Sequence, residues 1–373
     1  MKKSLFAIAA VTAFAGAAQA QSSVTVYGLY DGGYNAKDTA TTTAGAKTNT
    51  TTGGFTGGAQ ASSRLGFRGI EAMGGGTSAT FNLEYGVTPG TGATDTAAYT
   101  GMAGQSTTGV RTSIVGLTNN AFGTVNIGRQ LTGIHTIIAG TVFAGNNMVG
   151  DLAYQSQAGS TSYTTNTRVH LNAVRMNNSV AYVTPTFSGF SARADYSADR
   201  NTTSDNPNGI TIGNTGLSAA YVNGPFTVRA GYHAAKGNNT AANPIQTTTI
   251  NAVSARYSDK GLTAEAIYAN NKTEQIGVQQ SKVNATQLNV SYQIGAISPF
   301  VKYGIGKTET GISGAANADT SAMQFGALYT MSKRTNLYAA YGQTEIKVKS
   351  STTTTVNNKV SAQQAAIGMM HTF

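Results

Sequence analysis

The chain ends in the stretch Ile367-Gly368-Met369-Met370-His371-Thr372-Phe373, in which Ile367, Met369, His371 and Phe373 share one parity. The same period of two runs back to residue 360. A period of two describes a β-strand that has one face toward a nonpolar medium. Because the period continues to the last residue and closes on an aromatic ring, we expect residues 360–373 to form a paired strand.

The other end of the chain has the three parts of a secretory signal peptide. Met1-Lys2-Lys3 is the positive start, residues 5–15 are an apolar core too short to span a bilayer, and Ala18-Gln19-Ala20 is a small-x-small cleavage site. We therefore expect residues 1–20 to be removed and residues 21–373 to form one domain. An exported chain that closes on an amphipathic strand favours an all-β fold, an antiparallel up-and-down β-barrel of the outer membrane.

The composition supports a barrel. Hydrophobic residues make up 40% and charged residues only 11%, too few charges for an ordinary soluble surface. Beyond residue 20 no apolar run approaches the ~20 residues of a membrane helix, so the apolar residues must be dispersed by alternation. The 45 glycines and 18 tyrosines suit strands, turns and aromatic girdles. Cysteine is absent, and a closed barrel needs no disulfide.

The net charge is basic but dispersed. It is +10, or +8 when Lys2 and Lys3 leave with the signal peptide. A basic balance raises nucleic acid as a partner, but the Lys and Arg residues stand singly in strand-like segments and form no phosphate-binding tract. We therefore expect no nucleic-acid partner, and dispersed arginines fit the wall of a water-filled lumen better.

From residue 21 onward the chain alternates short turns with long polar connections, as an up-and-down barrel requires. We expect about sixteen strands, an even number in the range that leaves an aqueous channel. Tracts rich in Thr, Asn, Ser and Gly, including residues 36–61, 201–214, 238–249 and 349–358, are predicted as external loops. The predicted strands cover residues 24–34, 63–71, 79–85, 110–117, 122–130, 178–183, 190–196, 217–222, 226–233, 250–257, 262–269, 286–294, 300–305, 322–331, 336–344 and 360–373.

Two arginines of the second predicted strand share a face. Arg64 and Arg68 alternate with Leu65 and Phe67. An Arg at the mid-plane of the lipid face of a barrel costs roughly 2–4 kcal/mol, so both arginines are predicted to point inward. In the next strand the same reasoning turns Glu84 toward the lumen and near Arg64. The alternative is a charge pair that merely neutralises a plugged barrel, which would not need about sixteen strands.

The alternation does not decide which face of the wall four other basic residues occupy. Arg111 begins a strand in which apolar residues occupy both faces. Arg129 has the parity of the apolar residues before it, so it faces the lumen only if the strand ends or bulges there. Arg168 and Arg175 flank the return from the longest connection, residues 131–174, where each is either a lumen residue or a solvated loop charge.

Several segments occur in a characteristic order. They are residues 63–71 (SRLGFRGIE), 115–117 with 122–130 (VGL, FGTVNIGRQ), 175–182 with 185–190 (RMNNSVAY, PTFSGF) and 367–373 (IGMMHTF). Together they resemble the general porins of Gram-negative outer membranes, in particular the β-proteobacterial branch, over essentially the whole mature chain. The resemblance implies a homotrimer of barrels, each with its third external loop folded inward to narrow the pore. That loop corresponds to residues 131–174.

The resemblance also implies a pore constriction with a basic side built from wall residues. The corresponding positions are Arg64, Arg111 and Arg168, with Arg68 nearby and Glu84 as a wall acid. Many members of the family carry acids on the loop opposite, but here Asp151 is the only acid of residues 131–174, so cation selectivity is not expected to carry over. The apolar residues of this loop favour burial against the wall; they are Ile137, Ile138, Val142, Phe143 and Met148. The implied partners are outer-membrane lipid, lipopolysaccharide and a barrel assembly machinery that reads Phe373.

These patterns predict passive diffusion of small hydrophilic solutes, anionic and neutral, with a preference for anions, because basic rings in a pore select anions. No enzyme activity, cofactor or metal is expected, since the four histidines lack ligand spacing and no Ser/His/Asp constellation is present. Three alternatives stay open. They are a plugged barrel whose loops act as an adhesin or receptor, a secreted β-solenoid, for which no repeat period is found, and an outer-membrane enzyme.

Overall fold

The computed structural model describes residues 22–43, 45–87, 89, 109–139, 148–152, 175–203, 206–237, 246–275, 278–311, 317–349 and 358–373. The predicted signal peptide, residues 1–20, and the predicted lumen residue Arg168 lie outside these ranges. Within them, no helix has the length and apolar character to cross a membrane.

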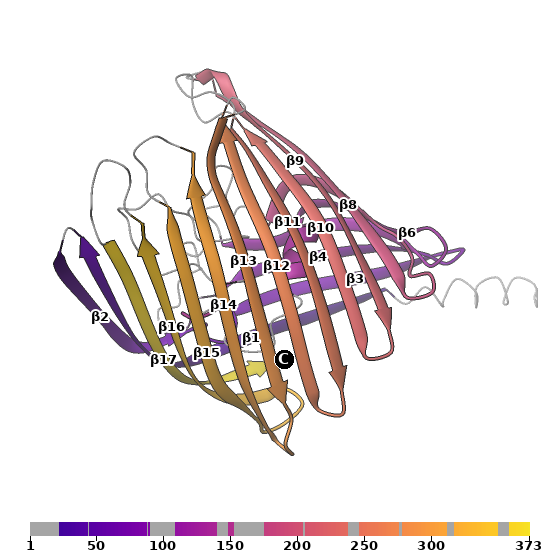
Figure 1. The fold of residues 1–373 in the computed structure, drawn as a ribbon. Helices are drawn as coiled ribbons and strands as arrows, with labels where there is room; N and C mark the ends of the chain where they lie inside the picture. The colour runs from indigo at the N-terminus through magenta and orange to yellow at the C-terminus, as the bar shows by residue number, and fades with distance from the viewer. Residues whose placement is uncertain are drawn as a thin grey trace, which may run out of the picture.

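Seventeen strands form one antiparallel sheet that closes on itself (Figure 1). From β3 onward each strand pairs with the next in the sequence, and β17 pairs with β1. The strands are β1 (Ser23–Thr43), β2 (Ala46–Gly57), β3 (Arg64–Gly74), β4 (Thr77–Gly86), β5 (Val110–Asn119), β6 (Gly123–Leu131), β7 (Arg175–Val183), β8 (Phe190–Thr203), β9 (Asn206–Asn223), β10 (Phe226–Gly237), β11 (Gln246–Asp259), β12 (Leu262–Gln275), β13 (Val278–Tyr292), β14 (Ile297–Thr310), β15 (Ala318–Thr330), β16 (Thr335–Val348) and β17 (Asn358–Thr372). This is the predicted up-and-down barrel.

The seventeen strands occupy sixteen positions around the barrel, because β2 and β3 share one. The first part of β1, from Ser23 to Leu29, pairs with β3. The second part, from Gly32 to Thr43, pairs with β2. The predicted number of strands is thus confirmed, and each predicted strand corresponds to an observed one.

Asp31 holds the junction between β2 and β3. It is completely buried. Its Oδ2 accepts hydrogen bonds of 2.8 Å from the backbone N–H groups of Gln60 and Ala61, and its Oδ1 accepts one of 2.8 Å from the Tyr338 hydroxyl. The carboxylate therefore satisfies backbone donors where the chain steps from one strand to the next and the ladder with β1 is interrupted.

Three of the predicted external loops are wrong in part. β1 and β2 form a hairpin through most of residues 36–61, β8 and β9 continue through most of residues 201–214, and β11 begins at Gln246. Beyond the lipid belt water lies on both faces of a strand, so polar residues fit either side and the alternation disappears while backbone pairing continues. The many β-branched threonines support this pairing.

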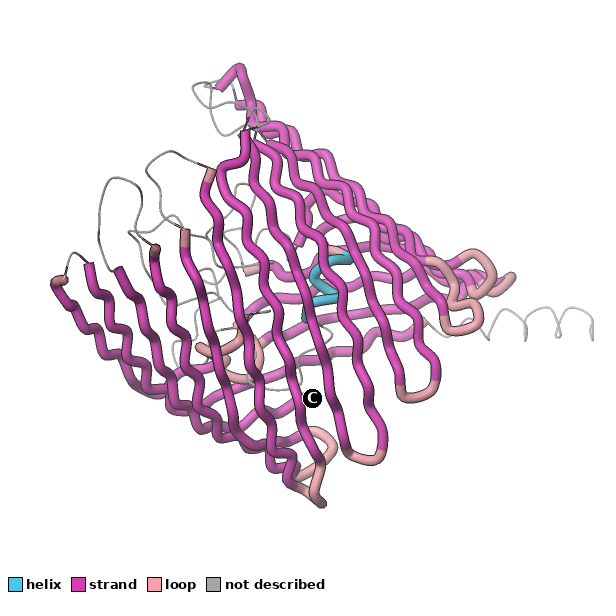
Figure 2. Tube along the Cα trace, viewed as in Figure 1, coloured by secondary structure: helices cyan, strands magenta, loops and turns pink. Residues whose placement is uncertain are grey.

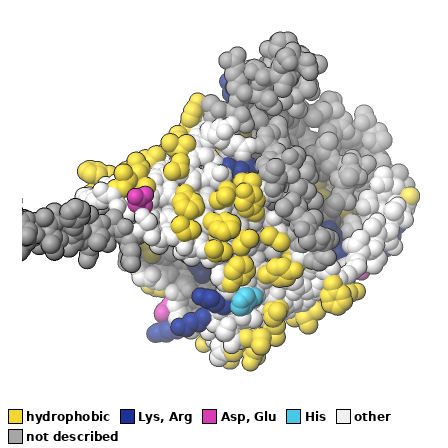
Figure 3. Space-filling view, turned by 180° about the vertical axis from the view of Figure 1, so that it is seen from behind, with side chains coloured by type: hydrophobic (Ala, Val, Ile, Leu, Met, Phe, Trp, Pro, Cys, Tyr) yellow, Lys and Arg dark blue, Asp and Glu magenta, His cyan; other side chains and the backbone are white. Residues whose placement is uncertain are grey.

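The two faces of the wall have opposite character, as β14 shows. Val301, Tyr303 and Ile305 are 46%, 52% and 54% exposed, whereas Phe300 is almost completely buried and Lys302 completely. Large exposed hydrophobic residues occur on strands all around the barrel, and in Figure 3 they spread over the outer surface. An apolar outer face around a polar interior is the pattern of a barrel that faces lipid.

The C-terminal strand closes the barrel. Phe373 and Gly28 exchange two backbone hydrogen bonds of 3.1 Å, and β17 pairs with β1 on one side and β16 on the other. Ile367 and Met369 are exposed on the outer face, while Ala366 is buried. The alternation predicted for the last strand is therefore confirmed.

The two ends of the barrel differ in their connections. At one end the strands are joined by tight turns such as Lys260-Gly261, whose φ angles of 47° and 84° are those of a two-residue type I′ hairpin turn. Phe373 lies at this end, because the neighbouring Thr372 N–H donates to Arg334 O in the β15–β16 turn. The opposite end carries the long connections.

Candidate functional site

A group of charged side chains lies on the inner face of β3, β4 and β5. Arg111 Nε is 2.6 Å from Glu84 Oε1, and both side chains are almost completely buried. The Tyr27 hydroxyl lies 2.8 Å from Asn82 Oδ1 and 3.1 Å from Glu84 Oε2, so it can donate to either oxygen. The guanidinium of Arg68 stands 5.2 Å from the centre of the Tyr27 ring, a cation–π contact. Tyr27 therefore connects the acid to a second arginine.

Arg64 lies beside this group. Its Nε donates to the Ser62 carbonyl oxygen at 3.2 Å, and its charge acts on Glu84. Glu84 is thus near Arg64 as the alternation predicts, but its salt bridge is with Arg111. The structure brings together four of the residues singled out in the sequence, which are Arg64, Arg68, Glu84 and Arg111.

A β-bulge turns Arg111 into the barrel. Counted along β5, Arg111 has the parity of Val115, which is exposed on the outer face. The pairing of β4 with β5 slips between Glu84 and Tyr85, so that Arg111 is the extra residue of the bulge. An extra residue reverses the alternation beyond it, and the guanidinium reaches the inner side.

Arg129 on β6 lies beside a second bulge, in which Asn177 and Asn178 of β7 stand opposite Arg129 alone. The pairing of β6 with β7 slips between Gly128 and Gln130, and Gly128 has a φ of 127°, a conformation that favours glycine. Arg129 is buried, and its Nε donates to Val110 O at 2.8 Å. It also hydrogen-bonds to Asn177. The bulge on which the sequence analysis made the placement of Arg129 depend is therefore present, with its extra residue on β7, and the inward direction of Arg129 stays a prediction.

Arg193 and Asp195 on β8 were missed in the sequence. Arg193 Nε is 2.6 Å from Asp195 Oδ1, and another Arg193 nitrogen donates to Leu131 O at 2.6 Å. Asp195 Oδ2 accepts a hydrogen bond of 2.7 Å from the N–H of Gly133. The pair therefore anchors the chain where it leaves β6. The alternation of β8 could have found them, because both have the parity opposite to its outward-facing aromatic residues.

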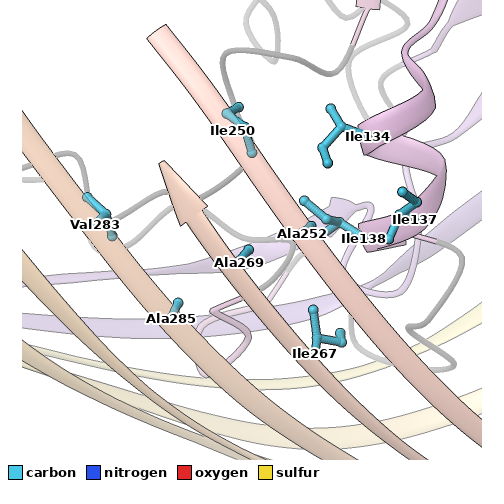
Figure 4. Packing of buried hydrophobic residues seen from close by; sticks show 9 residues of the cluster. All are labelled: Ile134, Ile137, Ile138, Ile250, Ala252, Ile267, Ala269, Val283 and Ala285. Atoms are coloured by element: carbon cyan, nitrogen blue, oxygen red, sulfur yellow. The ribbon is translucent and has the colours of Figure 1, made fainter. Parts of the chain in front are cut away.

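The short helix α2 (Gly133–Ala139) lies inside the ring of strands (Figure 2). Its start is capped by Thr132, whose Oγ1 accepts a hydrogen bond of 3.1 Å from the His135 N–H. Three isoleucines of the segment are buried against the inner wall of β11, β12 and β13 (Figure 4). The cluster consists of Ile134, Ile137, Ile138, Ile250, Ala252, Ile267, Ala269, Val283 and Ala285.

Residues 148–152 are a second part of the same connection bound to the inner wall. Asp151 Oδ2 and Lys302 Nζ form a salt bridge of 2.7 Å in which neither side chain is exposed. Gln287 donates to the other Asp151 oxygen at 3.2 Å and accepts from the Leu152 N–H at 2.7 Å. Three more hydrogen bonds join Val149 and Gly150 to Gln324, Thr344 and Gln364.

Asp151 therefore lies inside the barrel with its charge matched by a wall lysine. The apolar residues Ile137, Ile138 and Met148 are buried, as expected for a loop that packs on the wall. Two other residues of that expectation, Val142 and Phe143, lie outside the described residues.

Comparison with protein families decides what this barrel is. A family model described as Gram-negative porin matches residues 7–349. The chain belongs to the Gram-negative porin family. Outer membrane porin protein 32 of Delftia acidovorans is 30% identical to this porin over 91% of the chain and 88% of that protein. An outer membrane porin protein of Bordetella pertussis is 34% identical, and the match spans 65% of this chain and 62% of that protein.

Solved structures agree on the fold. An anion-selective porin from Comamonas acidovorans superposes with a TM-score of 0.68 at 22% identity, covering 95% of this chain and all of that one. The trimer form of OmpT from Vibrio cholerae superposes with a TM-score of 0.61 at 16% identity, covering 94% of this chain and 99% of that one. These likenesses show that the sheet of this porin closes in the manner of known porin barrels.

Beside its apolar cluster, the inner wall of this porin carries guanidinium, ammonium, carboxylate and phenol groups. Such groups act on a passing solute through charge and hydrogen bonding. Among the residues that the structure describes, no three His, Cys, Asp or Glu side chains are grouped so that they could hold a metal ion.

Proposed function

We propose that this porin is a water-filled channel of the outer membrane through which small hydrophilic solutes, anionic and neutral, diffuse passively with a preference for anions. The observation that supports the preference is the placement of charge inside the barrel. Glu84, Asp151 and Asp195 each hold a salt bridge to a basic side chain. Arg68, by contrast, contacts the Tyr27 ring, which positions a guanidinium without neutralising it.

The size of the effect follows from Coulomb's law in a wet pore. An anion about 4 Å from one guanidinium gains about 1 kcal/mol in water, which raises its local concentration about fivefold. Screening at physiological salt acts over about 8 Å, so arginines on neighbouring strands act together on one ion. Cations are depleted by the same factors.

The same proposal makes residues 131–174 the third external loop, folded inward to narrow the pore. It is supported by α2 and residues 148–152, which both contact inward-facing wall residues. Arg168 is proposed to stand on the basic side of the constriction together with Arg64, Arg68 and Arg111. Asp151 then attaches the loop to Lys302, and this salt bridge neutralises its negative charge, so that it does not oppose the arginines of the pore.

Assembly completes the proposal. Residues 1–20 are proposed to direct export and to be removed, leaving residues 21–373 as the barrel domain. Three barrels are proposed to form a homotrimer, in keeping with the trimer form of the structural neighbour from Vibrio cholerae. Phe373, at the end of the closing strand, is proposed as the signal for the barrel assembly machinery. The apolar outer face contacts membrane lipid, including lipopolysaccharide, and no catalytic step belongs to this proposal.

The reversal potential of the purified porin in a planar bilayer under a potassium chloride gradient tests the preference. We expect chloride to be favoured, and the double variant Arg64→Ser/Arg111→Ser to shift the potential toward cations, because Glu84 loses its salt bridge. The double variant Lys333→Ser/Arg334→Ser removes the same charge from a turn and is the control. A wild-type channel that prefers potassium would contradict the proposal, and a barrel without conductance would favour the adhesin or receptor alternative.

A further inference from the structure

One carboxylate of the inner wall has no partner. Glu265 on β12 is 4% exposed, and neither of its oxygens has a hydrogen-bond partner within the described ranges of the chain. The acids Glu84, Asp151 and Asp195, by contrast, each hold a salt bridge. A buried carboxylate without hydrogen bonds destabilises a fold. Glu265 therefore does not stabilise the barrel as these three acids do.

Two arginines flank Glu265 on the inner wall. Arg256 on β11 lies directly opposite Glu265, and Arg229 on β10 lies opposite Ser254, two residues before Arg256. The charges of both arginines act on Glu265, but its oxygens bond to neither. Nη1 of Arg229 and Oγ of Ser254 are buried as well and have no hydrogen-bond partner in the part of the chain that the structure describes. Polar groups that lie near one another without bonding are suited to bind a molecule between them. We call these four residues the Glu265 group.

The Glu265 group lies next to both parts of the long connection that are attached to the wall. On one side, Ser254 lies opposite Ile267 of the apolar cluster beneath α2 (Figure 4). On the other side, Asn289 separates Glu265 from Lys302, which holds Asp151. Arg229 and Arg256 are only half-buried, so a solute in the lumen can contact their guanidinium groups.

The chemistry of the group is that of a site for a molecule with both signs of charge. A guanidinium binds a carboxylate through paired hydrogen bonds, whereas the Glu265 carboxylate and the Ser254 hydroxyl accept hydrogen bonds from an ammonium group. A ligand of one sign would leave the buried part of the other sign without a partner, which is costly. An α-amino acid carries both groups on neighbouring atoms. One with an acidic side chain also has the net negative charge that balances two arginines and one glutamate.

We propose that the Glu265 group binds α-amino acids on their way through the pore, and acidic ones such as glutamate most tightly. The carboxylates of the solute bind the guanidinium groups of Arg229 and Arg256, and its ammonium group donates to Glu265 and Ser254. The inference rests on the proposed function, a diffusion channel that prefers anions, and deepens it by naming a class of solute. A simple dianion without an ammonium group is the competing ligand.

The test titrates the single-channel conductance of the purified porin in symmetrical potassium chloride. The ligands are L-glutamate and glutarate, which has the same carboxylates and no ammonium group. Glu265→Gln keeps the shape of the side chain and should weaken glutamate binding about tenfold, as loss of one hydrogen bond between charged groups does. Glutarate should bind this variant at least as well as the wild type. The control Glu309→Gln makes the same change at an exposed position of β14 and should alter neither.

Two further measurements complete the test. Arg229→Gln should weaken both ligands, because both carry the carboxylates that bind its guanidinium group. In the wild type itself, N-acetyl-L-glutamate, whose nitrogen carries no charge, should bind about tenfold more weakly than glutamate, and this result does not depend on the folding of any variant.

The proposal is overturned by an unchanged ratio of glutamate to glutarate binding in Glu265→Gln, by an Arg229→Gln channel that binds both as the wild type does, or by equal binding of glutamate and its N-acetyl derivative. These titrations use symmetrical salt. A wild-type channel that prefers potassium in a salt gradient would therefore contradict the proposed function without changing the glutamate result.

Discussion

Replacing Lys302 by Met is expected to loosen residues 148–152 from the inner wall. Removing one partner of a buried ion pair costs about 3–5 kcal/mol, because the other charge stays buried without compensation. The carboxylate left behind is that of Asp151, whose side chain is fully buried. The backbone of the segment is otherwise held by four hydrogen bonds to wall side chains, at about 1 kcal/mol each. Breaking the ion pair therefore costs about as much free energy as these four hydrogen bonds contribute together.

The assay is single-channel recording in planar bilayers. Lys302→Met should show a larger and noisier conductance, because the segment leaves the wall for part of the time. The variant should also shift the reversal potential toward cations, since the Asp151 carboxylate is no longer matched. Asp151→Asn, which leaves the lysine charge, should shift it toward anions. Lys307→Met, on the outward face of the same strand, is the matched control and should do neither.

The double variant Lys302→Met/Asp151→Leu separates the ion pair from the rest of the packing. Replacing both members of a buried pair by apolar residues is often close to neutral, so this variant should regain quiet, wild-type conductance. Such non-additivity is the mark of a direct interaction. The reasoning would be refuted by a Lys302→Met channel with wild-type conductance and selectivity, or by a double variant as noisy as the single one.

Two further predictions concern assembly and stability. Deleting Phe373 removes the two backbone hydrogen bonds to Gly28 and should lower the amount of folded, heat-modifiable oligomer on gels without changing export; normal assembly in cells would mean that the terminal residue is not read. Asp31→Ala leaves the N–H groups of Gln60 and Ala61 without their acceptor, which costs about 1–3 kcal/mol for each buried group. The temperature at which the barrel loses its folded mobility on gels should therefore fall. An unchanged temperature would contradict the role given to this carboxylate.

The sequence by itself determined the barrel, the number of its strand positions and the direction of Arg64, Arg68 and Glu84. These follow from a local constraint, because a face in contact with lipid requires an apolar residue at every second position. The constraint ends where the strands leave the membrane, which is why the β1–β2 hairpin and the long ends of β8 and β9 were predicted as loops.

Only the tertiary structure decided the direction of Arg111, the burial of Arg129, the role of Arg193 and Asp195, and the pairing of Asp151 with Lys302. A bulge is a relation between two strands, and the slip that turns Arg111 inward is set by the register with β4. The slip beside Arg129 is set by the register with β7. Asp151 and Lys302 are 151 positions apart in the chain. The inner face is polar and accepts many residue types, so no local pattern marks its partners; closure of the barrel brings them together.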